Sequence, residues 1–203
     1  MMGNVGLLYV GAVLFINGLM LLGRVETKSA GIFNLFVGVM QVLFPFYALI
    51  TAQDQSTIFQ ASGIFLFGFT YLLVGICNLK GYSGTALGWY SLWVAIMAIA
   101  YSLINFSQFG DFKFGIIWLL WSYLWFLFFL QLALGKDIGT YTGWVAIIQS
   151  WTTATIPAFL SLIGLWEHVN GMMTGIVTVV VLLSFIFLYQ RTTSRNNSKQ
   201  ASY

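Results

Sequence analysis

Three tryptophans in one uncharged stretch are the first residues whose type and spacing could bind a molecule. Trp118, Trp121 and Trp125 stand at i, i+3 and i+7 within residues 115–134, so they share one face of a helix. Indole rings stack on flat molecules, and each carries an N–H group that donates a hydrogen bond. The stripe is compatible either with aromatic packing between helices or with a narrow path for a flat, polar, uncharged solute.

Neutral polar side chains occur at helical spacing on three other apolar stretches. They are Gln149, Thr152 and Thr153 on one stretch, and Thr70 and Tyr71 beside Phe67 on another; on the third, the polar Asn17 follows an apolar stripe of Leu7, Val10 and Leu14. Aromatic faces with a few amide and hydroxyl groups suit a small neutral amide, because its planar body stacks while its N–H and C=O groups form hydrogen bonds. Packing between helices is the alternative for each cluster, and for Asn17 it is the one we favour.

Asp, Glu, Lys, Arg and His are missing from the interiors of the apolar stretches. Such groups mark proton relays, coupling-ion sites and voltage sensors, so their absence argues against a pump or a voltage sensor. The sequence has no Ser/His/Asp arrangement, HExxH motif or phosphate-binding loop. The single Cys77 and the single His168 give no metal-ligand spacing, and we expect His168 to be a solvated loop residue. We therefore expect no catalytic residues, no metal site and no cofactor.

The composition is that of a membrane protein. Charged residues make up 6% of the 203 residues and the mean hydropathy is +0.90, whereas a soluble domain has about 25% charged residues. The sequence predicts an all-α polytopic membrane protein with helices at about 4–23, 30–51, 57–79, 86–106, 114–134, 142–165 and 172–190. Residues 1–190 then form one transmembrane channel domain, followed by a disordered basic tail, 191–203. The first run lacks a basic flank, so we expect a spanning helix rather than a cleaved signal peptide.

The basic residues predict the orientation in the membrane. With the N-terminus outside, seven of the eight basic residues fall on the cytoplasmic side: Arg24, Lys28, Lys80, Lys136, Arg191, Arg195 and Lys199. Only Lys113 falls outside, as the positive-inside rule requires of short loops. The net charge of +3 therefore lies in loops and in the tail, and we expect no nucleic-acid partner.

The cytoplasmic loops also repeat. Arg24, Lys80 and Lys136 are each 56 residues apart, at the turns of three helix hairpins, and GWYSLWVAI at 88–96 resembles GWVAII at 143–148. Three related hairpins would enclose a central solute path, with one additional C-terminal helix.

Several stretches resemble the UreI/AmiS family of urea channels and amidase-associated amide transporters. They are LLYVG at 7–11, NLFVG at 34–38, LFGFTYL at 66–72, WYSLWVAI at 89–96, IIWLLW at 116–121, GWVAII at 143–148 and the IPA of 156–158. The resemblance implies a ring of helices with one solute path per protomer, and protomers assembled as a hexamer. The family's constriction residues correspond here to Leu7, Leu14, Phe67, Tyr71, Trp121, Leu124 and Trp125.

Two features depart from the acid-gated members of the family. Gln131 and Gln149 stand where we expect those channels to have membrane carboxylates, and their long histidine-rich external loops are missing. The seventh helix lies outside the resemblance, because members with six helices end near residue 168.

These observations predict a passive channel for urea and short aliphatic amides such as acetamide, in a bacterial plasma membrane and without acid gating. Gln149 and Thr153 join the constriction residues as the expected lining of the pore. The expected partners are the neutral solute, membrane lipid, identical subunits, and a cytoplasmic amidase or urease that consumes the solute. One alternative is a water or glycerol facilitator, although the asparagine signature of such channels is not visible. The other is a membrane sensor or scaffold, for which the tail is too short to form an effector domain.

Overall fold

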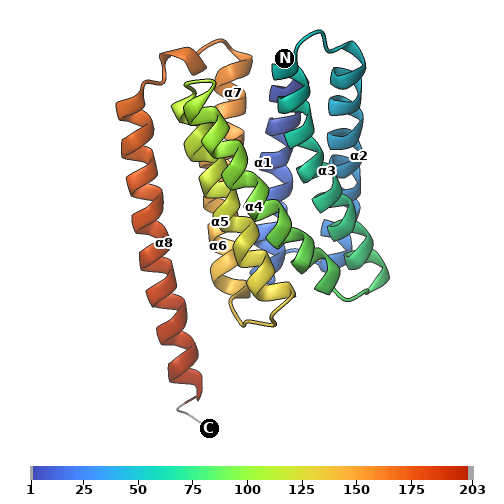
Figure 1. The fold of residues 1–203 in the computed structure, drawn as a ribbon. Helices are drawn as coiled ribbons and strands as arrows, with labels where there is room; N and C mark the ends of the chain where they lie inside the picture. Colours follow the sequence, from blue (N-terminus) through green and yellow to red (C-terminus); the bar gives the residue numbers. More distant parts are fainter. Residues whose placement is uncertain (1, 201–203) are drawn as a thin grey trace.

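The computed structural model describes residues 2–200, with the side chains of residues 3–192, and is helical throughout its regular elements (Figure 1). The elements are α1 (Met2–Leu21), α2 (Thr27–Thr51), α3 (Gln55–Lys80), α4 (Thr85–Ser107), α5 (Phe112–Leu132), α6 (Gly139–Gln149), the π-helical segment η1 (Ser150–Thr155), α7 (Ile156–Leu162), the short 3₁₀ turn η2 (Trp166–His168) and α8 (Gly171–Gln200). Seven of the described helices are long and apolar enough to cross a membrane. The predicted fold class is confirmed.

The helix ends follow from local chemistry. The Asp54 carboxylate accepts hydrogen bonds from the backbone N–H of Thr57 (2.7 Å) and from its hydroxyl (2.8 Å), which caps the first turn of α3. Asp111 caps α5 in the same way through the backbone N–H of Phe114 (2.9 Å). Gly81 ends α3 with a φ of 70°, a left-handed conformation that glycine adopts without steric cost. These caps fix where the spans begin and end.

The sixth span is one membrane crossing built from α6, η1 and α7. Pro157 lies in the first turn of α7 and lacks a backbone N–H, so the regular α-helical hydrogen-bond pattern cannot continue through it. Just before it, the backbone N–H of Ile156 donates to the carbonyl of Trp151, five residues back, and the Thr155 hydroxyl donates to the carbonyl of Ser150 (2.8 Å). The sequence predicts a single helix over 142–165 with a kink at Pro157, and the structure puts a π-helical turn there.

The first six spans close into a ring, because each packs on the next in the chain and α6 returns to α1. The closest pairs are α2 with α3, α4 with α5, and α6 with α1. Small residues permit this: a Cβ atom added at Gly75 would lie 2.9 Å from the carbonyl oxygen of Gly31, and one added at Gly18 would lie 2.8 Å from that of Gly143. The six spans therefore form three tightly packed pairs, as a threefold repeat would give. These pairs are not the predicted hairpins, whose two helices are joined by the loops at Arg24, Lys80 and Lys136.

The N-terminus and the loops at 52–54, 108–111 and 163–170 lie at one end of the ring, the upper end in Figure 1, called below the N-terminal end. The seventh span, α8, stands beside the ring next to α5 and α6, and 11% of its apolar stretch is buried. It continues past the expected end at 190 to Gln200, so residues 191–200, which we expected to be part of a disordered tail, are helical. Residues 201–203 of the predicted tail lie outside the described residues.

A candidate solute path

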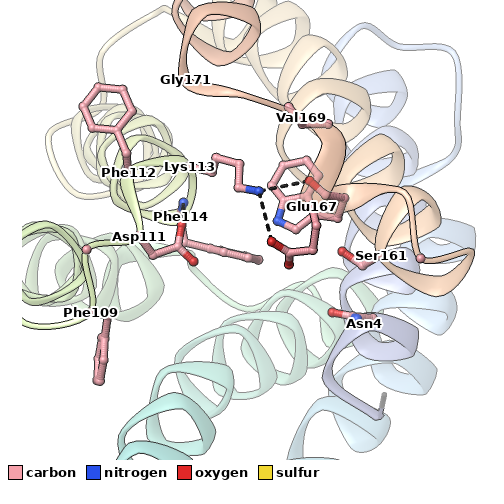
Figure 2. Close-up of a pocket in the computed structure, with 13 residues that line it drawn as sticks. Asn4, Phe109, Asp111, Phe112, Lys113, Phe114, Ser161, Glu167, Val169 and Gly171 are labelled. Atoms are coloured by element: carbon pink, nitrogen blue, oxygen red, sulfur yellow. Dashed lines mark hydrogen bonds and ion pairs between the residues drawn. The ribbon is translucent and has the colours of Figure 1, made fainter.

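Two of the loops at the N-terminal end, 108–111 and 163–170, border a cavity of about 600 Å³, called here the mouth cavity (Figure 2). Lys113 bridges it. Its ammonium group donates to the backbone carbonyl of Trp166 (3.0 Å), lies 4.8 Å from the centre of the Trp166 ring, and is 4.0 Å from a carboxylate oxygen of Glu167. The start of α5 is thereby tied to the segment that leads to α8. Because the Lys113 charge is held by these three partners, it is not directed at a passing solute.

A second cavity of about 290 Å³, the vestibule, lies next to the mouth cavity and shares Asn4, Asp111 and Phe114 with it. Side chains from the first five spans surround it. Its lining includes Leu7, Val10, Gln41, Phe59, Gln60, Phe67, Tyr101, Asn105, Trp118 and Trp121. The vestibule thus combines aromatic faces with neutral amide groups, as the sequence predicts for the site of a small neutral amide.

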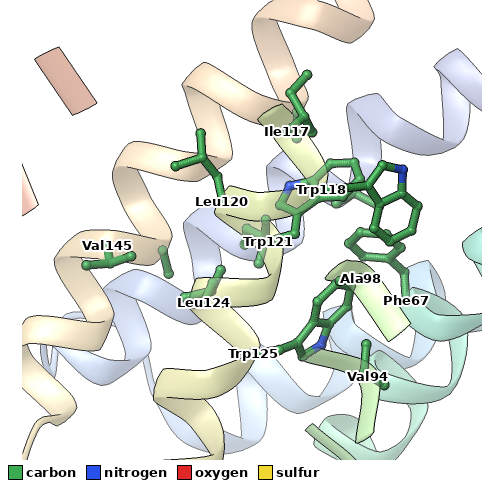
Figure 3. Packing of buried hydrophobic residues seen from close by; sticks show 14 of the residues in the cluster. Phe67, Val94, Ala98, Ile117, Trp118, Leu120, Trp121, Leu124, Trp125 and Val145 are labelled. Carbon is green, nitrogen blue, oxygen red and sulfur yellow. The ribbon is translucent and has the colours of Figure 1, made fainter. Parts of the chain in front are cut away.

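Below the vestibule, aromatic rings from α3 and α5 meet (Figure 3). The ring centre of Phe67 lies 4.8 Å from that of Trp121, nearly perpendicular to it, and 4.7 Å from that of Trp125. Trp118 and Trp121 contact edge to face at 5.0 Å. All four rings are at most 8% exposed. The stripe expected on the fifth helix therefore faces the interior of the ring of spans and packs around Phe67.

A cavity of about 20 Å³, the inner cavity, lies beyond these rings; its lining is Leu14, Phe67, Tyr71, Trp121, Leu124, Trp125 and Phe128. Phe67 and Trp121 line both the vestibule and the inner cavity, so they stand between them. Leu7 borders the vestibule and Leu14 the inner cavity, about 10 Å apart along α1. The structure thus brings together the seven residues that the resemblance assigns to the constriction.

Gln149 and Thr153 lie behind this constriction and line neither the vestibule nor the inner cavity. The Thr153 hydroxyl accepts a hydrogen bond from the indole N–H of Trp121 (2.9 Å) and donates to the carbonyl of Gln149 (2.7 Å). The Gln149 amide donates to the carbonyl of Leu120 (2.8 Å). Their contact with the solute stays a prediction: Thr153 and the Gln149 amide join the sixth span to α5, while the Gln149 side-chain oxygen has no hydrogen-bond partner in the described structure.

Tyr71 supplies a polar atom at the constriction. Its side chain is 2% exposed, it borders the inner cavity, and its hydroxyl has no hydrogen-bond partner in the described structure. A buried hydroxyl without a partner costs free energy, and a passing amide or a water molecule would satisfy it. Tyr71 therefore presents an unpartnered hydroxyl at the inner cavity.

Sequence reasoning missed the second wall of the vestibule. The Tyr101 ring of α4 stacks on Trp118, with ring centres 4.5 Å apart and an interplanar angle of 18°, and its hydroxyl is 2.5 Å from the Ser62 hydroxyl of α3. The Gln41 amide of α2 donates to the carbonyl of Gly6 (2.6 Å). The sequence analysis did not use the spacing of Asn34 and Gln41, which stand at i and i+7 on one face of α2 and are both buried.

Asn17 has a packing role, as we favoured. Its amide donates to the Asn34 side-chain oxygen (3.0 Å), and the Asn34 amide donates back (2.6 Å), so the two residues join α1 to α2. Among the described residues, no group of three or more His, Cys, Asp or Glu side chains could hold a metal ion. Lining of the vestibule and the inner cavity is aromatic, aliphatic and neutral polar apart from Asp111, which caps α5.

Comparison with known proteins gives consistent results. A family model described as "AmiS/UreI family transporter" matches residues 2–165. The chain is 51% identical over 184 residues to a "putative transporter protein AmiS2" of Rhodococcus erythropolis (90% of this chain, 89% of the relative), and 46% identical over 190 residues to a "putative amidate substrates transporter protein" of Mycolicibacterium smegmatis (93% and 89%). The crystal structure of the urea channel of Helicobacter pylori superposes with a TM-score of 0.73 at 34% identity, and the match covers 82% of this chain and 99% of that one.

Proposed function

Since this chain belongs to the AmiS/UreI family of transporters, and is thus a transport protein rather than an enzyme, we propose that it is a passive channel for short aliphatic amides and urea. The proposal rests on the order of the cavities within the ring of spans. An aromatic and neutral polar vestibule leads to the Phe67, Trp121 and Trp125 rings, and a small inner cavity follows.

The chemistry of this path favours planar neutral solutes. A flat amide or urea molecule slides between aromatic faces, while its N–H and C=O groups meet polar atoms before and after the rings. In our proposal the Gln60 and Asn105 amides of the vestibule and the Tyr71 hydroxyl of the inner cavity provide those polar atoms. A charged solute would lose its hydration at the rings without gaining a counter-charge, so the rings exclude it.

In our proposal transport is passive because the constriction lacks an acidic, basic or histidine side chain. Coupling to a proton or an ion requires a side chain that binds it at membrane depth. Phe67, Tyr71, Trp121, Leu124 and Trp125 include no carboxylate, histidine or lysine. The solute therefore moves down its own gradient, and in the cell a cytoplasmic amidase or urease maintains that gradient.

The proposal includes a channel open at neutral pH. Gln131 and Gln149 cannot titrate, and the single histidine, His168, lies in the short turn η2 at the mouth. Histidine is the side chain whose charge changes near neutral pH, and one such group gives a shallow response. We also propose that the N-terminal end of the ring faces the outside of a bacterial plasma membrane, with the basic loops at Arg24, Lys80 and Lys136 inside, and that the protomers assemble as a hexamer.

Proteoliposomes containing the purified protein test this function. Stopped-flow light scattering would measure the permeabilities of acetamide, urea, glycerol and acetate. We expect acetamide and urea to equilibrate far faster than in protein-free liposomes, glycerol to be slow, acetate to be excluded, and a protonophore to have no effect. Glycerol faster than acetamide would favour a polyol facilitator, and accumulation of solute that collapses with a protonophore would contradict a passive channel.

A further inference from the structure

A groove of about 850 Å³ separates α8 from the ring of spans. Ile116, Leu119 and Tyr123 form one wall, at i, i+3 and i+7 on α5. Leu182, Ile186 and Tyr189 lie on the opposite wall, on α8. The groove is predominantly apolar and lies within spans that cross the membrane, where lipid is the solvent.

The floor of the groove is a chain of tyrosine contacts. The hydroxyls of Tyr123 and Tyr141 are 2.7 Å apart, which satisfies both polar groups within the protein. Phe185 stacks on Tyr123 at 5.7 Å, and Tyr189 contacts Tyr141 edge to face at 5.5 Å. These contacts hold α8 to the ring at one place along its length, and the groove remains beside them.

The size of the groove identifies its occupant. A helix that crosses the membrane is about 30 Å long and 10 Å or more wide, so it needs over ~2000 Å³ and does not fit into 850 Å³. From Thr178 to Tyr189 the α8 wall extends about 16 Å, which matches the ~15 Å hydrocarbon depth of one leaflet. A groove of this length and width, open to the membrane, fits an acyl chain.

The end of the groove identifies the headgroup. Tyr141 and Tyr189 lie there, and tyrosine is typical of the level at which lipid headgroups begin. Arg191 is not part of the groove lining; it is exposed at the same level, about half a turn around α8 from Leu182, with a long side chain that can extend into the headgroup layer. A cation at that level attracts the phosphate of an anionic lipid more than that of a zwitterionic one.

We propose that this groove binds one anionic phospholipid, with an acyl chain between α5 and α8 and its phosphate in the headgroup layer at the level of Arg191. The bound chain fills the space that the sparse contacts of α8 leave open. The seventh span is thus held to the ring partly by lipid. The proposal requires only that the protein lies in a membrane. Its test measures bound lipid rather than solute flux, so it succeeds or fails independently of the channel function.

Native mass spectrometry of the full-length protein in mild detergent tests the groove after phosphatidylglycerol or phosphatidylcholine is added. We expect Leu182→Trp to lose most of the retained phosphatidylglycerol, because the indole occupies the groove. The matched control is Leu183→Trp, one residue along on the exposed face of α8, which should retain as much as the wild type. Equal retention by the two variants would overturn the proposal.

The headgroup is tested by Arg191→Gln. The wild-type preference for phosphatidylglycerol over phosphatidylcholine should fall about fivefold, the effect of one basic residue near an anionic surface. An unchanged preference would remove Arg191 from the site.

A third experiment needs no variant. Phosphatidylglycerol with a photoreactive group in its acyl chain should label the wild-type protein. Peptides containing 116–123 and 178–189 should be labelled more strongly than peptides from the exposed face of α4. Uniform labelling of all lipid-facing helices would overturn the proposal.

Discussion

The fifth span and the seventh span are both apolar helices of membrane-crossing length, yet they occupy opposite environments. In α5, 56% of the apolar stretch is buried and its mean hydropathy is 1.8. In α8, 11% is buried although the mean hydropathy is higher, 2.4. The more apolar helix is thus the less buried one. Lipid tails are as apolar as leucine, so hydropathy indicates that a helix enters the membrane and not that it enters the protein.

Their polar contacts distinguish the two helices. Around α5, polar groups bond between spans: Ser122 donates to the carbonyl of Ala95 (2.8 Å), Trp121 to Thr153, and Gln149 to the carbonyl of Leu120. On α8, the hydroxyls of Thr178 and Ser184 donate to carbonyls of their own helix, four residues back. A polar group that reaches another span marks the interior, whereas one that bonds within its own turn is compatible with lipid.

The largest effect is expected when one aromatic ring is removed from each of the two helices. Trp125→Ala should lower the ratio of acetamide to glycerol permeability about tenfold. The space beside Phe67 would widen for the bulkier glycerol, and the planar acetamide would lose stacking on a ring face worth about 1 kcal/mol. Phe187→Ala, on the exposed face of α8, should leave the ratio unchanged. Light scattering of proteoliposomes measures both. An unchanged ratio in a folded Trp125 variant would mean that the stripe only packs.

Removing one hydroxyl sharpens the comparison. Tyr71→Phe should lower acetamide permeability up to about fivefold, the value of one hydrogen bond to the passing solute. The thermal stability should stay the same or rise, because the hydroxyl has no partner in the structure. Tyr189→Phe on α8 is the matched control and should not alter flux. A Tyr71 variant with lower stability and normal flux would show a structural hydroxyl instead.

Thr153→Val tests whether bonding between spans orients the constriction. The Trp121 indole N–H would lose its acceptor, at a cost of about 1 kcal/mol in a membrane protein. For a chain of this size we expect the midpoint of thermal unfolding to fall by about 2–4 °C, and acetamide permeability by about twofold. Thr178→Val removes a hydroxyl that bonds only within α8, and should change neither value measurably. Similar effects of the two substitutions would break the comparison.

The smallest expected effect is that of pH. Acetamide permeability should change less than about twofold between about pH 5 and 8, the range in which histidine responds. The Thr57 backbone N–H lowers the pKa of Asp54, so the stabilising Asp54 cap is complete above the ordinary value of 3.8 and is lost only as the pH falls below it. Flux assays at several pH values measure the dependence. A steep rise on acidification would contradict the proposal, and His168→Ala would then identify or exclude the switch.

The sequence predicts much of this fold because the relevant signals are periodic. A run of about twenty apolar residues must form a helix in lipid, which locates the seven spans. The spacing of Trp118, Trp121 and Trp125 predicts that they share a face, and they do meet around Phe67. Leu124 required the resemblance to the family, because an ordinary leucine gives no signal by type or spacing.

The remaining features depend on contacts between distant parts of the chain. Thr153 and Trp121 are 32 residues apart, and no pattern within either helix states that they bond to each other. The sequence likewise does not show that Thr153 and the Gln149 amide bond to α5, although both residues are predicted to line the pore. The tight pairing of α6 with α1 likewise depends on two glycines, Gly18 and Gly143, on helices far apart in the sequence.

The π-helical segment at Ser150–Thr155 has a consequence for how this chain tolerates insertions and deletions. A π-helical turn accommodates one residue more than an α-helical turn, and one residue corresponds to about 100° of rotation. Deleting a single residue between 150 and 155 would therefore restore a plain α-helix and leave the following segment facing nearly its present direction, because the wide turn already absorbs the extra residue. The buried Pro157 and Ala158 would keep facing the interior, whereas the same deletion in a regular α-helical stretch would turn every later residue by about 100°. A one-residue deletion within this segment that spares Thr153 should thus be less damaging than one elsewhere in the spans.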